Sequence, residues 1–558
     1  MTTFYINNIQ YSTDKEQTIL EACTANNIFV PTLCFLKSPK SVGGCRVCLV
    51  KVEKFSKPLM SCIVKVTEGM KIFTDTKEVI TERKKSLIAL ASSHRFDCPN
   101  CLRQGKCNFK KLLEDNDITP PDTFLSENIN SSNSICLDTS KCISCKRCEA
   151  VCARQGVNAI KCQNIDNRCV ATFVNANAEK CEIGASPCIS CGQCTLVCPT
   201  ASLSELSQTA ELEKILDGTD VKVAVVAPAS KAVFAEMFKP ATEKQLVCAL
   251  KRLGFDKVFD LSLGADITAL EEATELEHRI KQNQNLPMFS SCCPGWVNFA
   301  HKFYPDILPH LSSTKTPQEI IGICVKTYFA DQKNIAPSDI KVVSITPCTA
   351  KKDEILLKPT IRGEKEVDIA LTMRELARMI DQKNIDVKSL PEMEYDDLLG
   401  TSSTLGNNFG QNGGVLCAIA GTIAQNANAE FNLTPTEITE EYATYLLHTV
   451  DRDYTFLAVS STGNMHKVLE EIETKTITPD FVEVMACVGG CVNGGGVQRV
   501  ANNATNLNKK VIARKNALAK ISAKKPFSPK DNPDVIAFYK YLNSLDEKIS
   551  LHNKNRFN

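Results

Sequence analysis

The chain has 558 residues, 43% of them hydrophobic, and a formal net charge of +1 from 65 basic and 64 acidic side chains. This balance gives no sign of a nucleic-acid-binding surface, and the length favours roughly three or four domains. Its longest apolar stretch, Val415 to Ala424, is about half of the ~20 residues that a membrane helix needs. We therefore expect no membrane span and interpret the stretch as a buried helix.

The N-terminus begins with a strand-like run, Phe4 to Asn7, and lacks the charged and apolar regions of a signal peptide. The chain holds 28 cysteines. Dense disulfide frameworks are typical of small secreted domains, and this chain is long and has no secretory pattern. We expect a cytoplasmic protein whose cysteines are reduced and bind metal.

Residues 1–78 alternate short apolar runs with turns and contain four cysteines, Cys34, Cys45, Cys48 and Cys62. The pattern resembles a plant-type ferredoxin domain of β-grasp fold, in which four thiolates hold a 2Fe-2S cluster. The spacing between the first two cysteines is longer than in the shortest plant-type pattern. Ligand type alone leaves zinc open as an alternative, because an all-cysteine set suits both metals.

Residues 79–118 contain one imidazole and three thiols at short range, His94, Cys98, Cys101 and Cys107. Four such ligands hold either one 4Fe-4S cubane or one zinc ion, and the spacing does not decide between them. The segment resembles the His-ligated 4Fe-4S module of hydrogenases and of the large iron-sulfur subunit of respiratory complex I. That resemblance favours a small His/Cys cluster domain.

A Pro/Ser/Asn-rich linker, Thr119 to Ser134, leads to residues 133–210, where one cysteine pattern occurs twice. The two runs are Cys142, Cys145, Cys148, Cys152 and Cys188, Cys191, Cys194, Cys198. Each run matches the bacterial two-cluster ferredoxin signature, in which the fourth cysteine ligates the other cluster. We expect Cys198 to join the first three cysteines and Cys152 to join the second three. Three cysteines of the insert, Cys162, Cys169 and Cys181, match no ligand position and are expected to be buried.

Residues 211–500 alternate apolar strands with helical stretches, which predicts an α/β domain with a largely parallel sheet. The expected strands are Val221–Ala227, Lys257–Leu261, Lys341–Ile345, Phe456–Ser460 and Phe481–Met485. Three cysteines, Cys293, Cys348 and Cys487, come just after apolar strand-like runs. Since ligands of open α/β sheets bind at the carboxyl ends of strands, these sulfurs should converge on one cleft.

Three motifs in this half resemble the signatures of iron-iron (FeFe) hydrogenases: Ser290 to Trp296 (SSCCPGW), Thr346 to Glu354 (TPCTAKKDE) and Glu483 to Gly496 (EVMACVGGCVNGGG). The resemblance implies that Cys293, Cys348, Cys487 and Cys491 hold the cubane of the H-cluster. Cys491 would bridge to a two-iron subsite carrying CO, cyanide and azadithiolate. Lys351 would bond a cyanide, Met485 would pack beside the subsite, and Gly494 and Gly495 would let the backbone approach the cofactor.

The same resemblance leaves Cys292 free to carry protons. Upstream, Glu272, Glu275 and Arg279 are spaced i, i+3 and i+7 and share one helix face. By itself a charged helix face is usually solvated. The resemblance instead implies a proton relay from Cys292 through a water, Glu272, Ser312 and Glu275 to Arg279.

Two positions depart from the family pattern: Ser290 replaces the usual Thr, and Thr346 replaces the usual Met. Thr346 exchanges a thioether for a hydroxyl near the subsite, with an effect whose direction the sequence does not give. Cys248, Cys324 and Cys417 match no ligand position and are expected to be buried. Residues 501–558 resemble a C-terminal segment that wraps the catalytic domain.

The sequence as a whole predicts a hydrogenase that reversibly reduces protons to H2 with electrons from a reduced ferredoxin or similar soluble carrier. Its cofactors would be one 2Fe-2S cluster, three accessory 4Fe-4S clusters and the H-cluster, whose two-iron subsite requires maturation enzymes. One alternative is the catalytic subunit of an electron-bifurcating, NAD-linked complex, in which partners would supply the missing dinucleotide fingerprint. Another is a non-catalytic iron-sulfur protein or H2 sensor, but such relatives would be expected to lose Cys292, Lys351 or the two glutamates.

Overall fold

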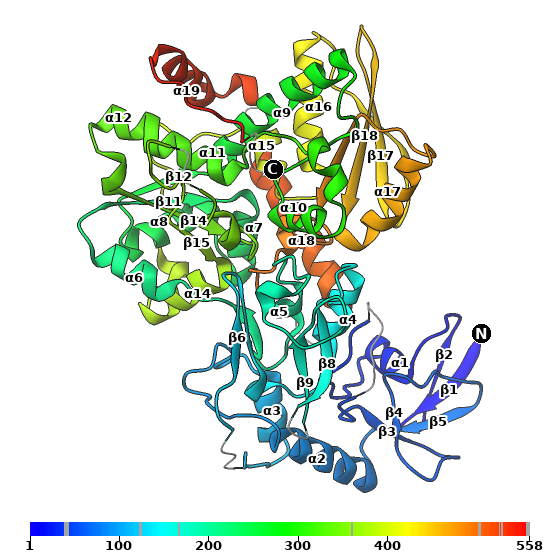
Figure 1. Ribbon diagram of the computed structural model, residues 1–558. Coiled ribbons are helices and arrows are strands. Elements are labelled where there is room, and N and C mark those ends of the chain that lie inside the picture. Colours follow the sequence, from blue (N-terminus) through cyan, green and yellow to red (C-terminus); the bar gives the residue numbers. More distant parts are fainter. Residues whose placement is uncertain are drawn as a thin grey trace.

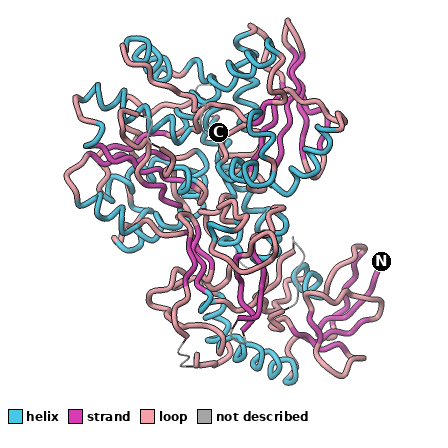
Figure 2. The backbone as a smooth tube through the Cα atoms, in the orientation of Figure 1, coloured by secondary structure: helices cyan, strands magenta, loops and turns pink. Residues whose placement is uncertain are grey.

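The computed structural model describes residues 1–37, 44–121, 125–165, 168–358, 361–499, 504–523, 525 and 528–553. The start expected for the C-terminal segment, residue 501, lies outside these ranges. Figure 1 shows the first 210 or so residues, blue to cyan, below a larger body, green to red. Strands form separate sheets in the two parts, as the magenta segments of Figure 2 show.

The N-terminal residues form a five-stranded sheet of order β2-β1-β5-β3-β4. Its elements are β1 (Thr2–Ile6), β2 (Ile9–Thr13), α1 (Ile19–Ala25), β3 (Leu49–Val52), β4 (Leu59–Met60) and β5 (Met70–Phe73). β1 pairs in parallel with β5 and antiparallel with β2. The inward side chains Phe4, Ile6, Val50 and Ile72 are fully buried, which gives a ferredoxin-like domain around one core.

Two helices, α2 (Lys77–Ala91) and α3 (Asn108–Glu114), precede a three-stranded sheet of order β10-β7-β6. Its strands are β6 (Ile129–Ser131), β7 (Ile135–Asp138) and β10 (Leu203–Glu205). The end of the expected linker is therefore an edge strand. The sequence pattern did not predict this strand because Asn130 and Ser131 are poor strand formers. Backbone pairing with β7 holds β6 in place.

Between these strands, two short helices begin inside the repeated cysteine runs: α4 (Arg147–Arg154) and α5 (Gln193–Val197). The insert is a hairpin of β8 (Ile160–Ile165) and β9 (Arg168–Phe173). Its Cys162 and Cys169, and Cys181 beyond it, are partly exposed, so the expectation of burial was wrong. A two-stranded hairpin has too little cover to bury both faces.

The larger body contains a fully parallel sheet of order β12-β11-β14-β15. Its strands are β11 (Val221–Val226), β12 (Lys257–Asp260), β14 (Ile340–Thr346) and β15 (Ile369–Thr372). Helices connect and flank them: α6 (Thr209–Asp217), α7 (Pro228–Met237), α8 (Glu243–Leu253), α9 (Ser262–Gln282), α11 (Pro317–Cys324), α12 (Ala330–Lys333), α13 (Lys351–Glu354) and α14 (Met373–Gln382). The predicted strands of this sheet are confirmed within a residue or two.

The second sheet, of order β13-β19-β18-β17-β16, is mixed, so the expectation of a largely parallel sheet holds for the first sheet and fails for this one. Its strands are β13 (Met288–Phe289), β16 (Leu433–Ile438), β17 (Tyr442–His448), β18 (Asp453–Ser460) and β19 (Phe481–Met485). β16, β17 and β18 form an antiparallel meander, because connections of a few residues can only reverse the chain. Around this sheet lie α10 (Pro294–Phe303), α15 (Thr404–Asn408), α16 (Gly414–Asn426) and α17 (Met465–Glu473).

The apolar stretch Val415 to Ala424 lies in α16 and, apart from the partly exposed Cys417, is almost wholly buried. No helix among the described residues is long and apolar enough to span a membrane. Cys248 and Cys324 are buried, as expected.

The C-terminal segment lies across the catalytic body through α18 (Ala504–Ser522) and α19 (Pro533–Ser544). The buried guanidinium of Arg514 donates to the Val492 carbonyl and pairs with Glu236. Further on, Lys315 and Asn553 donate backbone bonds to Leu551 and Ser313. The end of the described chain is thereby attached to the segment that leads into α11.

Candidate active site

A small, mostly apolar cavity of about 80 Å³ lies where β11, β13, β14 and β19 end. Cys292, Cys293, Cys348 and Cys491 all line it, together with Lys351 and Met485. Strand ends of both sheets thus deliver motifs that are far apart in sequence to one place, as the position of the cysteines after strands predicted.

Four thiols form the wall of this region. Burial and then the charges of Cys191, Cys348, Cys293 and Cys491 raise the pKa of Cys487 well above its ordinary value. Burial and Cys293 likewise raise the pKa of Cys348 to about 12. Thiolates packed together in an apolar setting repel one another, and a cationic metal centre is what stabilises such a set. The donor set therefore fits an iron-sulfur cubane.

Unpartnered polar atoms also face this cavity. Ser344 Oγ and Gln318 Oε1 are buried and have no hydrogen-bond partner among the described residues, and both residues line the cavity. Buried polar atoms are normally bonded, so these two suit a polar ligand such as the two-iron subsite carries. Thr346 Oγ1, in contrast, accepts a bond of 3.3 Å from the Cys348 backbone amide.

Lys351 is held by Glu354, whose two carboxyl oxygens lie 2.8 and 3.0 Å from its Nζ. Burial lowers the pKa of Lys351, but Glu354 outweighs it and the net pKa is raised. The lysine therefore stays a cation at the cavity wall. Met485 is 2% exposed and contributes a soft apolar surface.

Gly494 and Gly495 are absent from the residues described as lining this cavity. A Cβ on Gly494 would lie 2.4 Å from the Pro347 carbonyl oxygen, and one on Gly495 would lie 2.5 Å from that of Cys191. These glycines allow close packing of protein backbone. They allow the third motif, Glu483 to Gly496, to pack closely against the second motif at Pro347 and against the ferredoxin-like segment at Cys191.

Cys292 and Glu272 lie together at the inner end of the expected relay. Burial and then the Glu272 charge raise the pKa of the Cys292 thiol well above its ordinary value. Burial raises the pKa of Glu272 to about 8, although the Ser312 hydroxyl partly opposes this. Neither carboxyl oxygen of Glu272 is in hydrogen-bonding geometry with a described residue, and the side chain is fully buried on α9. A solvated helix face is therefore excluded for this residue.

The outer end of the expected relay is a hydrogen-bonded network around Glu275 of the same helix. Ser312 Oγ donates to Glu275 Oε2 at 3.2 Å, and the Ser313 amide donates to both oxygens of Glu275. Arg279 holds Glu275 from the other side, with Nη2 2.6 Å from Oε1. The structure thus places Cys292, Glu272, Ser312 and Glu275 near one another, with Arg279 bonded to Glu275.

Cys198 lies near the first ferredoxin-type run and Cys152 lies near the second, and Cys198 also lies near Cys194 of its own run. The Cys198 charge helps to raise the pKa of Cys142 and of Cys145. The Cys152 charge helps to raise the pKa of Cys191 and of Cys194. The second run also abuts the catalytic cysteines, because Thr349 donates to the Ser190 carbonyl at 2.7 Å. Gly192 permits this contact, since a Cβ there would lie 2.3 Å from Thr349 Oγ1.

In the His94 module, the imidazole, Cys98, Cys101 and Cys107 line one pocket. Burial lowers the pKa of His94 to about 4, so the ring is neutral. Its Nδ1 lies 3.0 Å from the Lys141 carbonyl oxygen and must donate to it. This bond fixes the orientation of the imidazole in the pocket.

The first four cysteines lie in contact: Cys34 interacts with Cys45 and Cys62, and Cys48 interacts with Cys62. Within the described residues, no three His, Cys, Asp or Glu side chains are placed to hold a single metal ion. Cys34, Cys45, Cys107 and Cys145 border one apolar cluster built around Leu33 and Phe109. Three cysteine sets therefore meet there.

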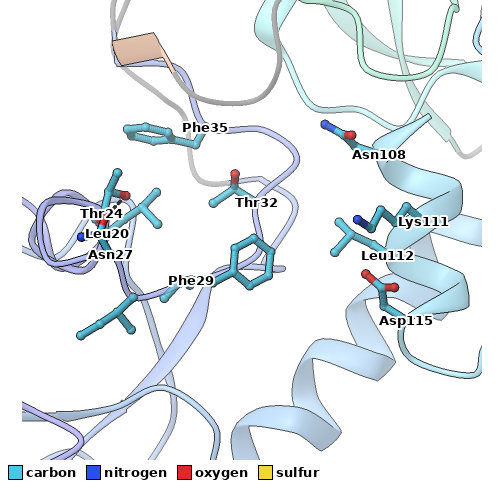
Figure 3. Close-up of a pocket in the computed structure, with 12 residues that line it drawn as sticks. Leu20, Thr24, Asn27, Phe29, Thr32, Phe35, Asn108, Lys111, Leu112 and Asp115 are labelled. Carbon is cyan, nitrogen blue, oxygen red and sulfur yellow. Dashed lines mark hydrogen bonds between the residues drawn. The ribbon is translucent and has the colours of Figure 1, made fainter. Parts of the chain in front are cut away.

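A larger cleft of about 550 Å³ lies between α1 with the loop after it and α3. Figure 3 shows Phe29 and Thr32 facing Lys111 and Asp115 across it. The described residues that line this cleft include no cysteine or histidine. It is therefore no candidate for the metal chemistry.

Comparisons with known proteins agree with this geometry. The family described as iron only hydrogenase large subunit, C-terminal domain, matches residues 220–495, and a 2Fe-2S iron-sulfur cluster binding domain matches residues 1–77. Iron hydrogenase 1 of Clostridium pasteurianum is 36% identical over 90% of this chain and 89% of its own length. The chain belongs to the iron-only, or FeFe, hydrogenase family.

Two further relatives support the assignment. The NADP-reducing hydrogenase subunit HndD of Solidesulfovibrio fructosivorans is 34% identical over 97% of this chain and 95% of its own length. The structure of a single-residue variant of apo [FeFe]-hydrogenase HydA1 from Chlamydomonas reinhardtii superposes with a TM-score of 0.54 at 30% identity. It covers 62% of this chain and 96% of that one.

Sequence reasoning missed two residues of this hydrogenase's site. Glu354 belongs to a quoted motif but had no role until its pairing with Lys351 was seen. Gln318 follows no motif, so no signal marked it. Its Nε2 donates to Glu354 at 3.0 Å, which fixes its amide at the cavity wall.

Proposed function

We propose that this hydrogenase reversibly reduces protons to H2 with electrons from a reduced ferredoxin or similar soluble carrier. The observation that carries the proposal is a small apolar cavity lined by Cys293, Cys348, Cys491 and the spare thiol Cys292. Cys487 lies next to the first three of these cysteines. Four thiols fit a cubane, and the fifth remains available for proton transfer.

We infer that electrons enter through a 2Fe-2S cluster on Cys34, Cys45, Cys48 and Cys62 and a 4Fe-4S cluster on His94, Cys98, Cys101 and Cys107. Both sets border the core that includes Cys145. Two further 4Fe-4S clusters, on the crossed ferredoxin-type runs, then lead to the catalytic cysteines. The Thr349–Ser190 contact makes this last junction tight, as short electron-transfer distances require.

When bound, the H-cluster supplies the irons at which electrons and protons combine. The chain's residues hold it and handle protons. Lys351 offers a fixed cation to an anionic ligand in an apolar cavity, and Met485 excludes water. In the direction of H2 production, Cys292 gives its thiol proton to the site, and Glu272, which is protonated at neutral pH because of its raised pKa, replaces that proton. Ser312 and Glu275 continue the path outward.

A second candidate is the catalytic subunit of an NAD(P)-linked assembly. The near full-length similarity to the NADP-reducing subunit HndD favours it. Since this sequence shows no flavin or dinucleotide fingerprint, NAD(P) chemistry would need partner subunits. Copurification of a flavoprotein with the native chain, and NAD(P)-dependent H2 turnover of that complex, would support this candidate against a ferredoxin-dependent single chain.

The test is to mature the protein anaerobically, with the enzymes that build the two-iron subsite, and to assay H2 production with reduced viologen. We expect activity, and Cys292→Ala should keep the H-cluster infrared bands but lose about 10²–10⁴-fold of the rate, as expected for a lost proton-transfer group. Cys417→Ala, at a cysteine outside the site, is the control and should remain active. An intact H-cluster without turnover would refute catalysis, and normal turnover of Cys292→Ala would refute the proton role.

A further inference from the structure

The proposed relay has an outer end that needs a group able to exchange protons with water. Arg279 lies there, but its guanidinium donates to Glu275 and to the carbonyls of Leu311 and His310. Arginine remains protonated in proteins and has no acceptor atom. Arg279 therefore positions Glu275 and cannot itself take up or release a proton.

An imidazole from the far end of the chain lies next to Glu275. His552 Nδ1 is 2.9 Å from Ser313 Oγ and 3.9 Å from Glu275 Oε2, and its Nε2 is 3.0 Å from Glu271 Oε2. The side chain is 29% exposed, so it touches both solvent and the relay. Imidazole is the side chain that gains and loses protons most readily near neutral pH.

The backbone fixes this position. The Asn553 amide donates to the Ser313 carbonyl at 2.8 Å, and the Lys315 amide donates to Leu551 at 2.9 Å. His552 is thus held beside the loop that carries Ser312, the relay hydroxyl. A chain end that only covered the surface would not need to present an imidazole to two glutamates.

The charged and titratable groups around the imidazole support proton exchange. Glu271 and Glu275 face it from α9, with Arg279 behind Glu275, and Tyr539 of α19 donates to Glu271. Although burial raises the pKa of Glu271, its bonds to His552 and Tyr539 bring the net pKa below the ordinary value. Glu271 therefore stays ionised and orients the ring through Nε2.

We propose that His552 is the group that exchanges protons between solvent and Glu275, which makes the C-terminal segment part of the proton pathway. The proposal rests on the proposed relay. In the direction of H2 production, the imidazole takes a proton from water, and the Nδ1–H bond then breaks as an O–H bond forms on Glu275. The Ser313 hydroxyl, or a small ring movement, bridges the 3.9 Å between them. The ring is left neutral and ready for the next proton.

The experiment compares matured holoenzymes carrying His552→Ala and His552→Gln with wild type from pH 6 to 9, with viologen as donor. We expect both variants to lose roughly tenfold of the rate, less than the ~10²–10⁴-fold typical of a proton-transfer group, because water can partly replace an exposed one. Added imidazole should restore His552→Ala. His448→Ala removes another surface histidine that pairs with a carboxylate, Asp453 at 2.7 Å, and should behave as wild type.

Unchanged rates in His552→Ala at every pH would overturn the proposal. Recovery in His552→Gln, or a loss that imidazole does not restore, would also overturn it, because a purely structural bond would then explain the effect. Cys292→Ala, assayed in parallel, distinguishes failure of the whole relay from failure of the His552 proposal. If it turns over normally, the relay itself is wrong, whereas a slow Cys292→Ala beside a normal His552→Ala rejects only His552.

Discussion

In residues 1–210 each cysteine set comes from one or two short stretches of chain, whereas the catalytic set comes from three motifs spread between Cys293 and Cys491. The first half builds its sites from local turns at the ends of short helices such as α4 and α5. The second half needs two complete sheets to bring its sulfurs together. Ligand binding is thus a local property in one half and a property of the whole fold in the other.

The two parts also contain ion pairs that differ in burial. In the catalytic half Lys231 is fully buried, with Nζ 2.8 Å from both oxygens of Asp260 and 2.7 Å from Asn407. In the N-terminal domain Lys71 pairs with Glu53 at 3.1 Å while both side chains remain about half exposed. Buried charges depend on each partner, whereas exposed pairs are screened by water.

The largest expected difference between the halves concerns a single lost thiol. Cys348→Ala should abolish H2 production, by about 10³-fold or more, because the four catalytic thiols act as one unit. Cys101→Ala, its counterpart in the His94 module, should lose one accessory cluster and only part of the viologen-driven rate, since small donors can enter elsewhere. Iron content and H2 production per molecule measure both. Equal losses would show that the accessory chain is as indispensable as the catalytic site.

This contrast also explains what the sequence could and could not reveal. The ligand runs Cys142–Cys152 and Cys188–Cys198 were readable because spacing within one turn determines which thiols meet. Strands β11, β14 and β19 could be predicted because they are predominantly apolar and mostly buried on both faces. The antiparallel pairing of β16, β17 and β18 depends on tertiary partners. The roles of Glu354, Gln318 and His552 were hidden for the same reason, because each is defined by a residue from another element.

A smaller effect should distinguish the ion pairs. Lys231→Met should lower the free energy of unfolding by about 3–5 kcal/mol, because it leaves Asp260 buried with less compensation. The loss of stability should be about 3 kcal/mol, since Lys525 Nζ also lies 3.2 Å from Asp260 Oδ2 and still compensates part of its charge. Anaerobic urea denaturation measures it. The matched control, Lys71→Met, should change stability by less than about 1 kcal/mol, and a comparable loss there would remove this difference between the halves.

The smallest effect is a change in pH dependence that arises from a carboxyl group of the catalytic half. The folded pKa of Glu272, about 8, exceeds its ordinary value of 4.5, so the folded state holds a proton that the unfolded state releases. Its stabilising contribution is complete below pH 4.5 and is lost as pH rises towards 8, with a slope of at most about 1.4 kcal/mol per pH unit. Glu483 and Asp266, whose pKa values burial raises to about 7 and 6, add slope of the same sign.

Glu272→Gln keeps the shape of the side chain but cannot ionise. Between pH 6 and 8 the free energy of unfolding of this variant should therefore fall less steeply with pH than that of wild type. The difference in slope should be at most about 1.4 kcal/mol per pH unit, the value for one titrating proton. Urea midpoints at half-unit pH steps measure the difference. Parallel curves for the two proteins would mean that Glu272 is ionised in the folded state. In that case the inner end of the relay would hold a carboxylate at neutral pH, which would have to gain a proton from the side of Ser312 and Glu275 before it could supply Cys292.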